Sequence, residues 1–295
     1  MTTIGIDVGG TSIRAAAVDP SSGAVLAVAR GSTRVPSLDT EICRVVAELR
    51  SVVDVSAVGL AVAGFVASDR RTVMFAPHLP WRASAVADRL AGLIGLPVVL
   101  EHDANAAGVA ESRFGALRGA RVGLLVALGT GIGAALVIDG AVYRGAFGVA
   151  PELGHLRLVP EGRECPCGKR GCWERYCSGT ALAATALEMG AGELSGREVA
   201  RLAAAGDAVA LAAVGEMARW LGEGLALVAD VYDPEVVVIG GGVSGSAELF
   251  LGDAVRRYEA VMTGAGHRPV ARVVGAEMGE EAGMVGAAVL AGGVG

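Results

Sequence analysis

The chain has 295 residues, which is enough for two domains and excludes a disulfide-stapled miniprotein. Hydrophobic residues make up 53% and charged residues 19%, so the whole length is expected to fold. The net charge of −6 argues against nucleic acid and an anionic membrane as partners, and a small molecule is the expected ligand. The 45 glycines, about twice the average usage, are typical of α/β proteins whose turns approach phosphates.

The first predicted element is a β-hairpin whose turn can bind phosphate. An apolar run leads into Asp7-Val8-Gly9-Gly10-Thr11, and a second apolar run ends at Asp19. Glycines let backbone N–H groups approach phosphate oxygens, the Thr11 hydroxyl can add a hydrogen bond, and Asp7 can hold Mg²⁺. Taken alone, the motif also fits an ordinary hairpin turn. No basic and apolar segments of a secretory signal precede the strand, so the cytoplasm is the expected location.

Strands alternate with helices in the part of the chain that follows. We expect a strand at 24–29, a helix at 38–50, a strand at 58–62, a helix at 83–93 and a strand at 97–100. This alternation predicts an α/β layer fold.

Asp103 stands where the strand after Pro97 ends and a helix begins. The aspartate can cap that helix, the role of most aspartates in such places. It can also be a general base that accepts a hydroxyl proton during phosphoryl transfer. That reaction depends chiefly on positioning and charge stabilisation, so a modest base is sufficient. Both interpretations fit these residues.

A second glycine turn indicates an internal duplication. The segment 129–139, Gly-Thr-Gly-Ile-Gly followed by an apolar run and an aspartate, aligns with 9–19. The uncharged stretch 122–138 is therefore interpreted as two buried strands around a turn and not as a membrane span. We predict two similar α/β domains, at 1–117 and 118–278.

A third glycine turn, Gly240-Gly241-Gly242, follows a predicted strand at 236–239. Ordinary turn chemistry explains one such loop more easily than three at strand ends. The three glycine turns together therefore favour phosphate binding.

Four of the five cysteines fall between residues 165 and 177, which suggests metal binding in a reducing compartment. Cys165, Cys167 and Cys172, with His155 upstream, form the donor set of a closed tetrahedral zinc site, which is structural. Free thiols in a surface loop are the alternative. Cys177 is interpreted as a bystander, and Cys43 is expected to pack in the core.

Two glutamates lie in the irregular stretch 145–179, which contains the four clustered cysteines and is called the cysteine loop below. Glu152 lies three residues before His155, and Glu174 two residues after Cys172. Brought together by a zinc-stiffened loop, their carboxylates can accept hydrogen bonds from several hydroxyls, as a sugar requires. Without that loop, two solvated glutamates would be the default.

These motifs resemble those of the ROK family of sugar kinases and repressors, and within it the bacterial glucokinases. The most specific matches are Cys-x-Cys-Gly-x-x-Gly-Cys-x-Glu at 165–174, Glu-x-Gly-His at 152–155 and Asp-x-Gly-Gly-Thr at 7–11, and the resemblance covers essentially the whole chain. It implies a duplicated ribonuclease-H-like (actin-like ATPase) fold of two α/β domains with a small zinc-bearing loop. The C-terminal helix, 279–295, would return to the first domain.

The resemblance also implies roles for individual residues. Asp103 would be the catalytic base, and His155 would serve both zinc and sugar through its two ring nitrogens. The sugar would be bound by Glu152, His155 and Glu174, with Gly64 lining the pocket and Asn105 close behind the base. MgATP would be bound by Asp7, Gly9, Gly10, Thr11, Gly129, Thr130, Gly131 and Gly240–Gly242. Structural Zn²⁺ would be bound by His155, Cys165, Cys167 and Cys172.

Two histidines depart from the family pattern. His102 precedes Asp103, and His78 lies in Phe-Ala-Pro-His-Leu, where family glucokinases usually have asparagine. A neutral imidazole offers one donor and one acceptor in a different geometry from an amide. Both are counted among the residues expected to bind substrate, and the sugar pocket is expected to differ.

The predicted function is phosphorylation of a hexose at the 6-hydroxyl by ATP, with glucose as the leading substrate. Mannose, fructose, an N-acetylhexosamine or a cyclitol are alternative acceptors, and polyphosphate is an alternative donor. A sugar-responsive regulator without catalysis is the alternative of another class, but the first strand begins near Thr3 and leaves no room for a DNA-binding domain ahead of it. The resemblance further suggests a homodimer or homotetramer.

Overall fold

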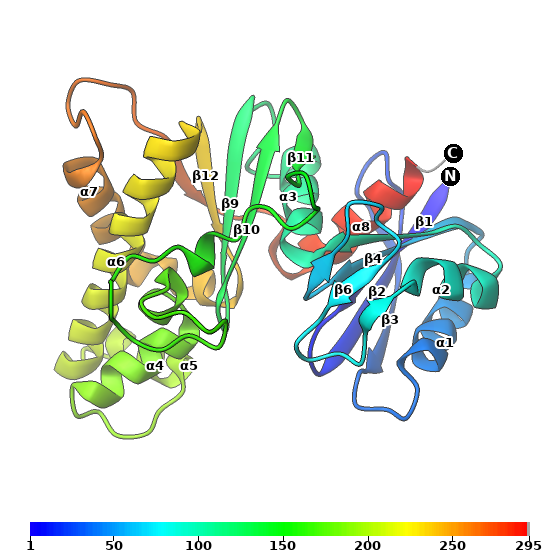
Figure 1. Ribbon diagram of the computed structural model, residues 1–295, viewed down its shortest axis with the longest axis horizontal. Helices are drawn as coiled ribbons and strands as arrows, with labels where there is room; N and C mark the ends of the chain where they lie inside the picture. Colours follow the sequence, from blue (N-terminus) through cyan, green and yellow to red (C-terminus); the bar gives the residue numbers. More distant parts are fainter. Residues whose placement is uncertain (294–295) are drawn as a thin grey trace. The chain divides into compact units, whose positions relative to one another are not determined.

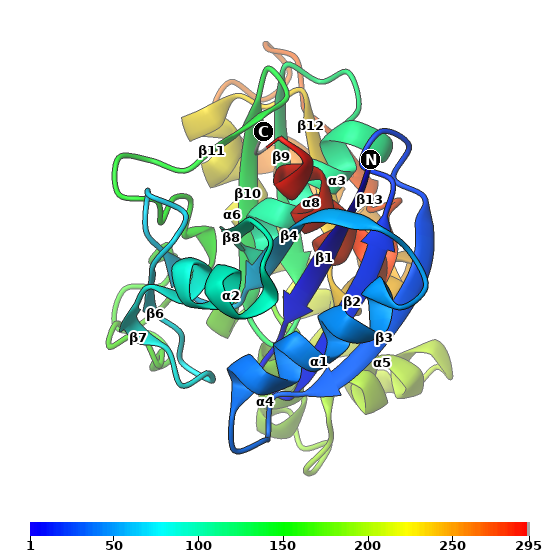
Figure 2. The same cartoon turned by 90° about the vertical axis from the view of Figure 1, so that its right-hand side faces the viewer.

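The computed structural model describes residues 1–293, and the chain packs into two compact units (Figures 1 and 2). Unit 1 comprises Met1–Arg121, Ala135–Pro151 and the described chain from Glu277 onward. Unit 2 comprises Val122–Ala134 and Glu152–Ala276. The domain boundaries predicted above, 1–117 and 118–278, stay a prediction.

The first sheet lies in unit 1 and has the order β3-β2-β1-β4-β8. Its strands are β1 (Thr2–Val8), β2 (Ser12–Val18), β3 (Val25–Ser32), β4 (Val55–Val62) and β8 (Val98–His102). β1, β2 and β3 form antiparallel pairs, whereas β1, β4 and β8 run parallel. The predicted hairpin is therefore present as β1 and β2, and the carboxyl ends of the parallel strands meet at one edge.

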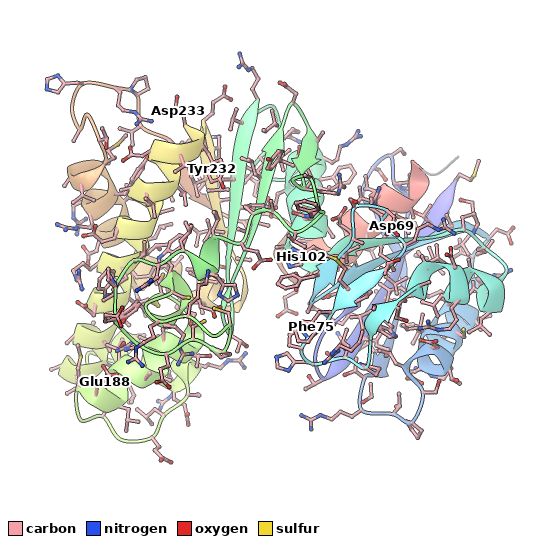
Figure 3. All side chains as sticks on the ribbon, in the orientation of Figure 1. Asp69, Phe75, His102, Glu188, Tyr232 and Asp233 are labelled. Atoms are coloured by element: carbon pink, nitrogen blue, oxygen red, sulfur yellow. The ribbon has the colours of Figure 1, made fainter. Side chains whose placement is uncertain are left out.

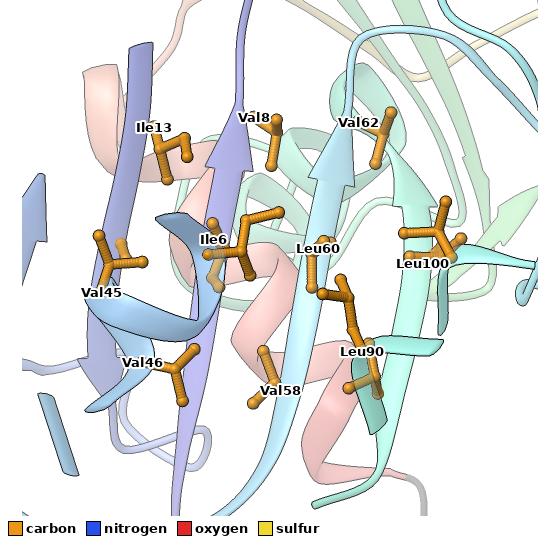
Figure 4. Packing of buried hydrophobic residues seen from close by; sticks show 14 of the residues in the cluster. Ile6, Val8, Ile13, Val45, Val46, Val58, Leu60, Val62, Leu90 and Leu100 are labelled. Atoms are coloured by element: carbon orange, nitrogen blue, oxygen red, sulfur yellow. The ribbon is translucent and has the colours of Figure 1, made fainter. Parts of the chain in front are cut away.

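Alternation along the strands decides which helices cover each face of this sheet. Ile4, Ile6 and Val8 pack with α1 (Leu38–Arg50) and α2 (Val86–Ile94) in one buried cluster (Figure 4). The opposite face packs with α3 (Asp103–Phe114) and α8 (Ala282–Gly292). A Cβ at Gly5 would overlap the carbonyl of Met284, so α8 lies directly on β1.

Of two predicted helices, the first has the predicted bounds and the C-terminal one begins later than predicted. α1 has the predicted bounds, and its cap is Ser37, whose Oγ accepts a hydrogen bond from the Thr40 N–H at 3.3 Å. α8 begins at Ala282 after a 3-10 turn, η4 (Gly279–Glu281), and packs on the sheet of unit 1. Residues 294 and 295 of the predicted C-terminal helix lie outside the described residues.

A small sheet of unit 1 was not predicted. It consists of β5 (Phe65–Val66), β6 (Val73–Phe75) and β7 (Arg82–Ser84). The helix expected at 83–93 was wrong at its start, because Arg82 and Ser84 pair with β6 and α2 begins only at Val86. The Arg82 guanidinium holds this strand by donating to three main-chain carbonyls, those of Ala76, Leu79 and Trp81.

The second sheet has the order β11-β10-β9-β12-β13, the same topology as the first. Its strands are β9 (Val122–Leu128), β10 (Ile132–Ile138), β11 (Ala141–Tyr143), β12 (Val236–Gly240) and β13 (Arg272–Gly275). The uncharged stretch is thus two strands around a turn, as predicted. In the part of the chain that the structure describes, no helix is long and apolar enough to cross a membrane.

The helices of unit 2 lie between β10 and β13 in the sequence. They are α4 (Gly179–Glu188), α5 (Gly196–Ala204), α6 (Ala208–Tyr232) and α7 (Leu251–Val261). The cysteine loop before them contains two 3-10 turns, η1 (Leu153–His155) and η2 (Trp173–Arg175), and η3 (Gly242–Leu249) follows β12. Trp173 is fully buried, and its Nε1–H donates to the carbonyl of Trp220 on α6 at 2.9 Å. The cysteine loop therefore packs against α6.

Candidate active site

The first glycine turn joins β1 to β2 and carries a charged pair. Gly9 N–H donates to the carbonyl of Ser12 at 3.0 Å, which closes the turn and leaves Gly10 and Thr11 exposed. Asp7 Oδ2 lies 2.6 Å from Arg14 Nη2 on the paired strand. Burial raises the pKa of Asp7, and Arg14 opposes that rise. The turn thus presents two exposed residues, Gly10 and Thr11, beside a carboxylate whose charge is partly balanced by Arg14.

Two residues predicted to bind substrate lie near this turn and near the small sheet of unit 1. His78 is exposed and lies against Gly10, because a Cβ at Gly10 would stand 3.1 Å from the His78 Cβ. Gly64 follows β4, and a Cβ there would stand 2.6 Å from the carbonyl oxygen of Phe75, so only glycine fits this approach. The structure therefore places His78 beside the first glycine turn and Gly64 beside β6.

Asp103 is the first residue of α3, directly after β8. The residue at the N-cap position is His102, which makes no side-chain capping bond, so Asp103 is not the cap of this helix. Asp103 Oδ1 accepts the Ala104 N–H at 2.7 Å and lies 3.1 Å from His102 Nε2. The Asp103 side chain is 41% exposed. Its negative charge also raises the pKa of Asp7.

Glu101, which the sequence analysis did not single out, holds the residues on both sides of Asp103. It is 3% exposed, and its Oε2 lies 2.6 Å from Arg144 Nη2 and 3.5 Å from Arg70 Nε. Its Oε1 accepts the His102 N–H at 3.1 Å and the Asn105 Nδ2–H at 3.0 Å. A glutamate inside an apolar strand was the signal for this role, because such a charge needs partners.

The predicted metal ligands form one cluster in unit 2. The donor atoms of His155, Cys165, Cys167 and Cys172 all lie within 4.8 Å of one another. Cys167 and Cys172 sulfurs are 3.6 Å apart, and Cys165 Sγ is 3.7 Å from His155 Nδ1. Donors bound to one tetrahedral zinc stand about 3.5–3.8 Å apart, given bonds of about 2.3 Å to sulfur and 2.0 Å to nitrogen. The donor set and its spacing therefore fit zinc.

The other two cysteines have the positions expected for them. Cys177 is buried outside the cluster, and burial raises the pKa of its thiol. Cys43 packs partly buried against the core of unit 1. Neither cysteine belongs to the cluster of four candidate ligands.

The cysteine loop brings the two predicted glutamates to His155. Glu174 Oε1 lies 3.5 Å from His155 Nδ1, and Glu152 Oε2 lies 3.9 Å from His155 Nε2. Nδ1 faces Cys165 and Nε2 faces Glu152, so the imidazole and the two carboxylates form one polar group on the cysteine loop. Glu174 also reaches the second glycine turn, where its Oε2 lies 3.4 Å from the Ile132 N–H.

The second and third glycine turns are neighbours at the carboxyl ends of two parallel strands, β9 and β12. Gly129 N–H donates to the carbonyl of Gly131 at 2.9 Å, and Thr180 at the start of α4 donates to the carbonyl of Thr130 at 2.7 Å. Gly241 has φ +81°, and a Cβ there would overlap the Leu128 backbone. Ligands of α/β sheets bind at such strand ends, so the pair of turns fits a phosphate-bearing nucleotide.

The predicted site residues thus gather in groups within each unit. Figure 3 shows His102 at the end of β8 and Phe75 on β6, both in unit 1. Unit 1 carries the first glycine turn and Asp103. Unit 2 carries the two other glycine turns, the cysteine cluster and the two glutamates.

Comparison with known proteins supports the family resemblance of the sequence. The ROK family matches residues 3–293. A glucokinase of Streptomyces coelicolor is 39% identical over 308 residues, covering 98% of this chain and 97% of that protein.

Two solved structures are similar over almost the whole length. One is a ROK family glucokinase from Streptomyces griseus in complex with glucose and AMPPNP, with a TM-score of 0.86, 41% identity and 99% of both chains covered. The other is a ROK hexokinase from Thermus thermophilus, with a TM-score of 0.85, 34% identity and coverage of 99% of this chain and 98% of that one. The predicted duplicated α/β fold is confirmed.

Proposed function

The chain belongs to the ROK family, and we propose that it is an ATP-dependent sugar kinase that phosphorylates glucose at the 6-hydroxyl. The observation that carries this proposal is the full-length similarity to ROK glucokinases, one of them in complex with glucose and AMPPNP. The carboxylate of Asp103, partly exposed at the end of β8, supports it, because phosphoryl transfer to an alcohol needs a group that accepts the hydroxyl proton.

In the proposed reaction Asp103 takes the proton of the sugar 6-hydroxyl. The hydroxyl oxygen forms a bond to the γ-phosphorus of ATP, and the bond from that phosphorus to the bridging oxygen breaks, which releases ADP. Asp103 is suited to this step because it does not cap α3 and keeps one oxygen outside the main-chain hydrogen bond.

The sugar is assigned to the residues that the family resemblance implies. His155 Nε2, Glu152 and Glu174 form one group of donors and acceptors, which supports recognition of several hydroxyls. The full set of proposed substrate-binding residues is Gly64, His78, His102, Asp103, Asn105, Glu152, His155 and Glu174.

The three glycine turns are assigned to the nucleotide. Asp7 would hold Mg²⁺, directly or through water, and the ion supplies charge neutralisation on the phosphates when bound. The remaining proposed residues bind phosphate and ribose groups through main-chain and hydroxyl donors: Gly9, Gly10, Thr11, Gly129, Thr130, Gly131, Gly240, Gly241 and Gly242.

The cysteine cluster is assigned a structural zinc. When bound, the ion supplies a closed tetrahedral centre that stiffens the loop carrying Glu152 and Glu174. His155, Cys165, Cys167 and Cys172 would hold it, and their spacing supports this. Three thiolates persist best where thiols stay reduced, so we place the reaction in the cytoplasm. The homodimer or homotetramer stays a prediction.

A kinase assay of the purified chain tests the proposal. ADP release is measured with MgATP and glucose, mannose, fructose, N-acetylglucosamine, N-acetylmannosamine or a cyclitol, and polyphosphate is tried as the donor. We expect kcat/KM for glucose with MgATP to exceed that of every other pair. A higher value for another acceptor would assign that sugar, and the histidines at 78 and 102 would be the first residues to examine. Turnover of none would overturn the proposed activity.

A further inference from the structure

The two carboxylate oxygens of Glu101, the buried glutamate before His102, have different partners. Oε2 accepts hydrogen bonds from Arg144 Nε at 2.8 Å and from Arg144 Nη2 at 2.6 Å. Oε1 accepts hydrogen bonds from the main-chain N–H of His102 at 3.1 Å and from Asn105 Nδ2 at 3.0 Å. One oxygen is therefore bound to an arginine, and the other is bound to the start of α3.

The partners of Oε1 lie on both sides of Asp103 in the chain. His102 is the N-cap residue of α3, and Asn105 belongs to the first turn of the same helix. Because an ionised carboxylate only accepts hydrogen bonds, the amide NH₂ group of the buried Asn105 faces Glu101. Two anchors that flank Asp103 thus fix the backbone from which its partly exposed side chain extends.

The strand that carries Glu101 is itself held along both edges. β8 is the last strand in the order of the first sheet and pairs with β4 on one side. On its other side the carbonyl of Arg70 accepts the Leu100 N–H at 3.0 Å, and Arg70 Nε donates to the Leu100 carbonyl at 3.3 Å. Arg70 adopts φ +55°, a left-handed conformation that is uncommon outside glycine. The backbone directly before Glu101 therefore has little freedom to shift.

Arg144, which follows β11, determines how the Glu101 carboxylate is turned. A buried carboxylate needs close partners to remain charged, and Arg144 supplies two donors to Oε2. Arg144 Nη1 also donates to the carbonyl of Val142 at 3.3 Å, which holds the guanidinium against its own chain. Because one carbon joins the two carboxylate oxygens, the arginine that holds Oε2 also fixes the direction of Oε1.

We propose that Glu101 is a positioning residue for phosphoryl transfer, which anchors the start of α3 through Oε1 and so sets the place of Asp103. This inference rests on the proposed kinase activity and adds a residue to its chemical step. The same anchors hold His102 and Asn105, which are assigned to the sugar, so loss of the anchors should affect both kcat and the sugar KM. The KM for MgATP should stay unchanged, because the residues assigned to the nucleotide are not among these partners of Glu101.

The test compares two double variants, Glu101→Gln with Arg144→Met and Glu101→Leu with Arg144→Met. Both remove the two charges of the buried pair, and uncharged replacement of such a pair is often neutral for stability. Glutamine keeps an oxygen for the two donors of α3, whereas leucine has no acceptor. The comparison therefore isolates the hydrogen bonds of Oε1 from the charge of the pair.

Steady-state kinetics with MgATP and the preferred sugar give the readout. The glutamine double variant should keep kcat within about fivefold of the wild type, because the anchors remain. The leucine double variant should lower kcat by about 10- to 100-fold and raise the sugar KM, since a displacement of about 1 Å at a reacting group can cost about 100-fold in rate. Both should keep the MgATP KM within about twofold.

The matched control is Glu41→Leu with Arg44→Met, which removes another glutamate–arginine pair of unit 1. Glu41 and Arg44 lie on α1, with Oε1 2.8 Å from Nη2, and have no part in the proposed site. This variant should leave kcat and both KM values unchanged. Calorimetric titration with AMPPNP gives the fraction of folded chains to which each kcat is referred.

If the leucine double variant does not fold, Glu101→Ala with Arg144→Met takes its place. Alanine leaves room for water at the two donors of α3, but a water molecule does not fix their position. The same fall in kcat is therefore expected.

The inference would be overturned by equal kcat values in the glutamine and leucine double variants, whether both are fast or both are slow. It would also be overturned by a rise in the MgATP KM as large as the fall in kcat, or by an equal loss of kcat in the control pair. Failure of the proposed function is recognised separately, because the wild-type chain would then turn over no sugar at all.

Discussion

The turn after β1 and the turn after β9 occupy equivalent places in two sheets of the same topology, but different side chains surround them. In the first, Asp7 and Arg14 on the two hairpin strands form an ion pair beside the turn. In the second, the hairpin strands are uncharged, and the nearby charge comes from Glu174 on the cysteine loop. The first turn therefore has a charged group of its own, and the second depends on a distant segment.

The two copies share the backbone of the glycine turn and differ in the charged side chains around it. The backbone of a glycine turn is set by local residues and persists in both copies. In the first copy the charged residues, Asp7 and Arg14, lie on the hairpin strands. In the second copy the charged residue, Glu174, lies on the cysteine loop. If the two copies differ in role, substitutions of charged residues in the first should lower kcat or kcat/KM for MgATP, and substitutions around the second turn should raise the sugar KM.

Asp103→Asn is expected to have the largest effect, and it tests the charged chemistry of unit 1. An amide cannot accept the hydroxyl proton, so kcat should fall by about 10²–10⁴, the usual contribution of a general base. Sugar binding, measured by isothermal titration calorimetry, should change little because the side chain keeps its size. A variant with near-normal turnover would remove Asp103 from its role.

Asp7→Asn tests the carboxylate of the first turn. If Asp7 orients Mg²⁺, its loss should lower kcat/KM for MgATP by about 10–100-fold, with partial recovery at high Mg²⁺. Burial raises the pKa of Asp7. Acidification should therefore weaken Mg²⁺ binding by the wild type at a higher pH than it would if Asp7 had the ordinary aspartate pKa. Asp7→Asn should lack this pH dependence. Equal Mg²⁺ dependence in both proteins would contradict the assignment.

Cys167→Ser tests whether the cysteine loop delivers its carboxylates through zinc. Loss of one thiolate should abolish bound zinc, measured by elemental analysis, and raise the sugar KM by about tenfold or more as the loop loosens. Cys177→Ala, a buried cysteine outside the cluster, is the control and should keep its zinc. Unchanged metal content in Cys167→Ser would count against the site.

Gly131→Ala tests the link between the second turn and Glu174. A Cβ at Gly131 would overlap Glu174 Oε2, whereas a Cβ at Gly129 meets nothing within 4 Å. Displacement of Glu174 should raise the sugar KM by about fivefold or more, given the usual cost of overpacking. Gly129→Ala should leave that KM unchanged. Equal effects of the two substitutions would show that the turn acts without Glu174.

Features that depend on local pattern could be predicted from the sequence. The bounds of α1 follow from its periodicity, and the metal cluster follows from the spacing of Cys165, Cys167 and Cys172. The zinc-type donor set is compact because three of its four members lie within one loop. The duplicated hairpin was visible because few residues other than glycine fit such turns.

Features that depend on pairing across the fold could not. Each strand of the β5-β6-β7 sheet has two or three residues and is stable only when paired. Glu101 meets Arg144 although 43 positions separate them, and no local pattern marks that partner. His102 and Asp103 are adjacent in sequence, yet the 3.1 Å approach of His102 Nε2 to Asp103 Oδ1 depends on side-chain conformations that no local pattern marks.

The aspartates that end β2 and β10 give the last and smallest test of the comparison. The Asp19 carboxylate accepts hydrogen bonds from the Ser21 hydroxyl and N–H and from the Ser22 hydroxyl, which lower the pKa of Asp19 to about 2. Asp139 is followed by Gly140 and Ala141, which have no such hydroxyls.

A lowered folded-state pKa means that the bonds of Asp19 stabilise the fold above the ordinary aspartate pKa and are lost as the pH falls toward 2. Asp19→Asn should therefore unfold at lower urea concentration than the wild type near pH 6, and the difference should shrink between about pH 4 and 2. The effect should be small because water reaches the turn. Asp139→Asn is the matched control, since asparagine also adopts the left-handed conformation seen there, φ +49°. A difference that persists unchanged into acid would mean that the Asp19 turn is held by its backbone alone, as the turn at Asp139 is expected to be.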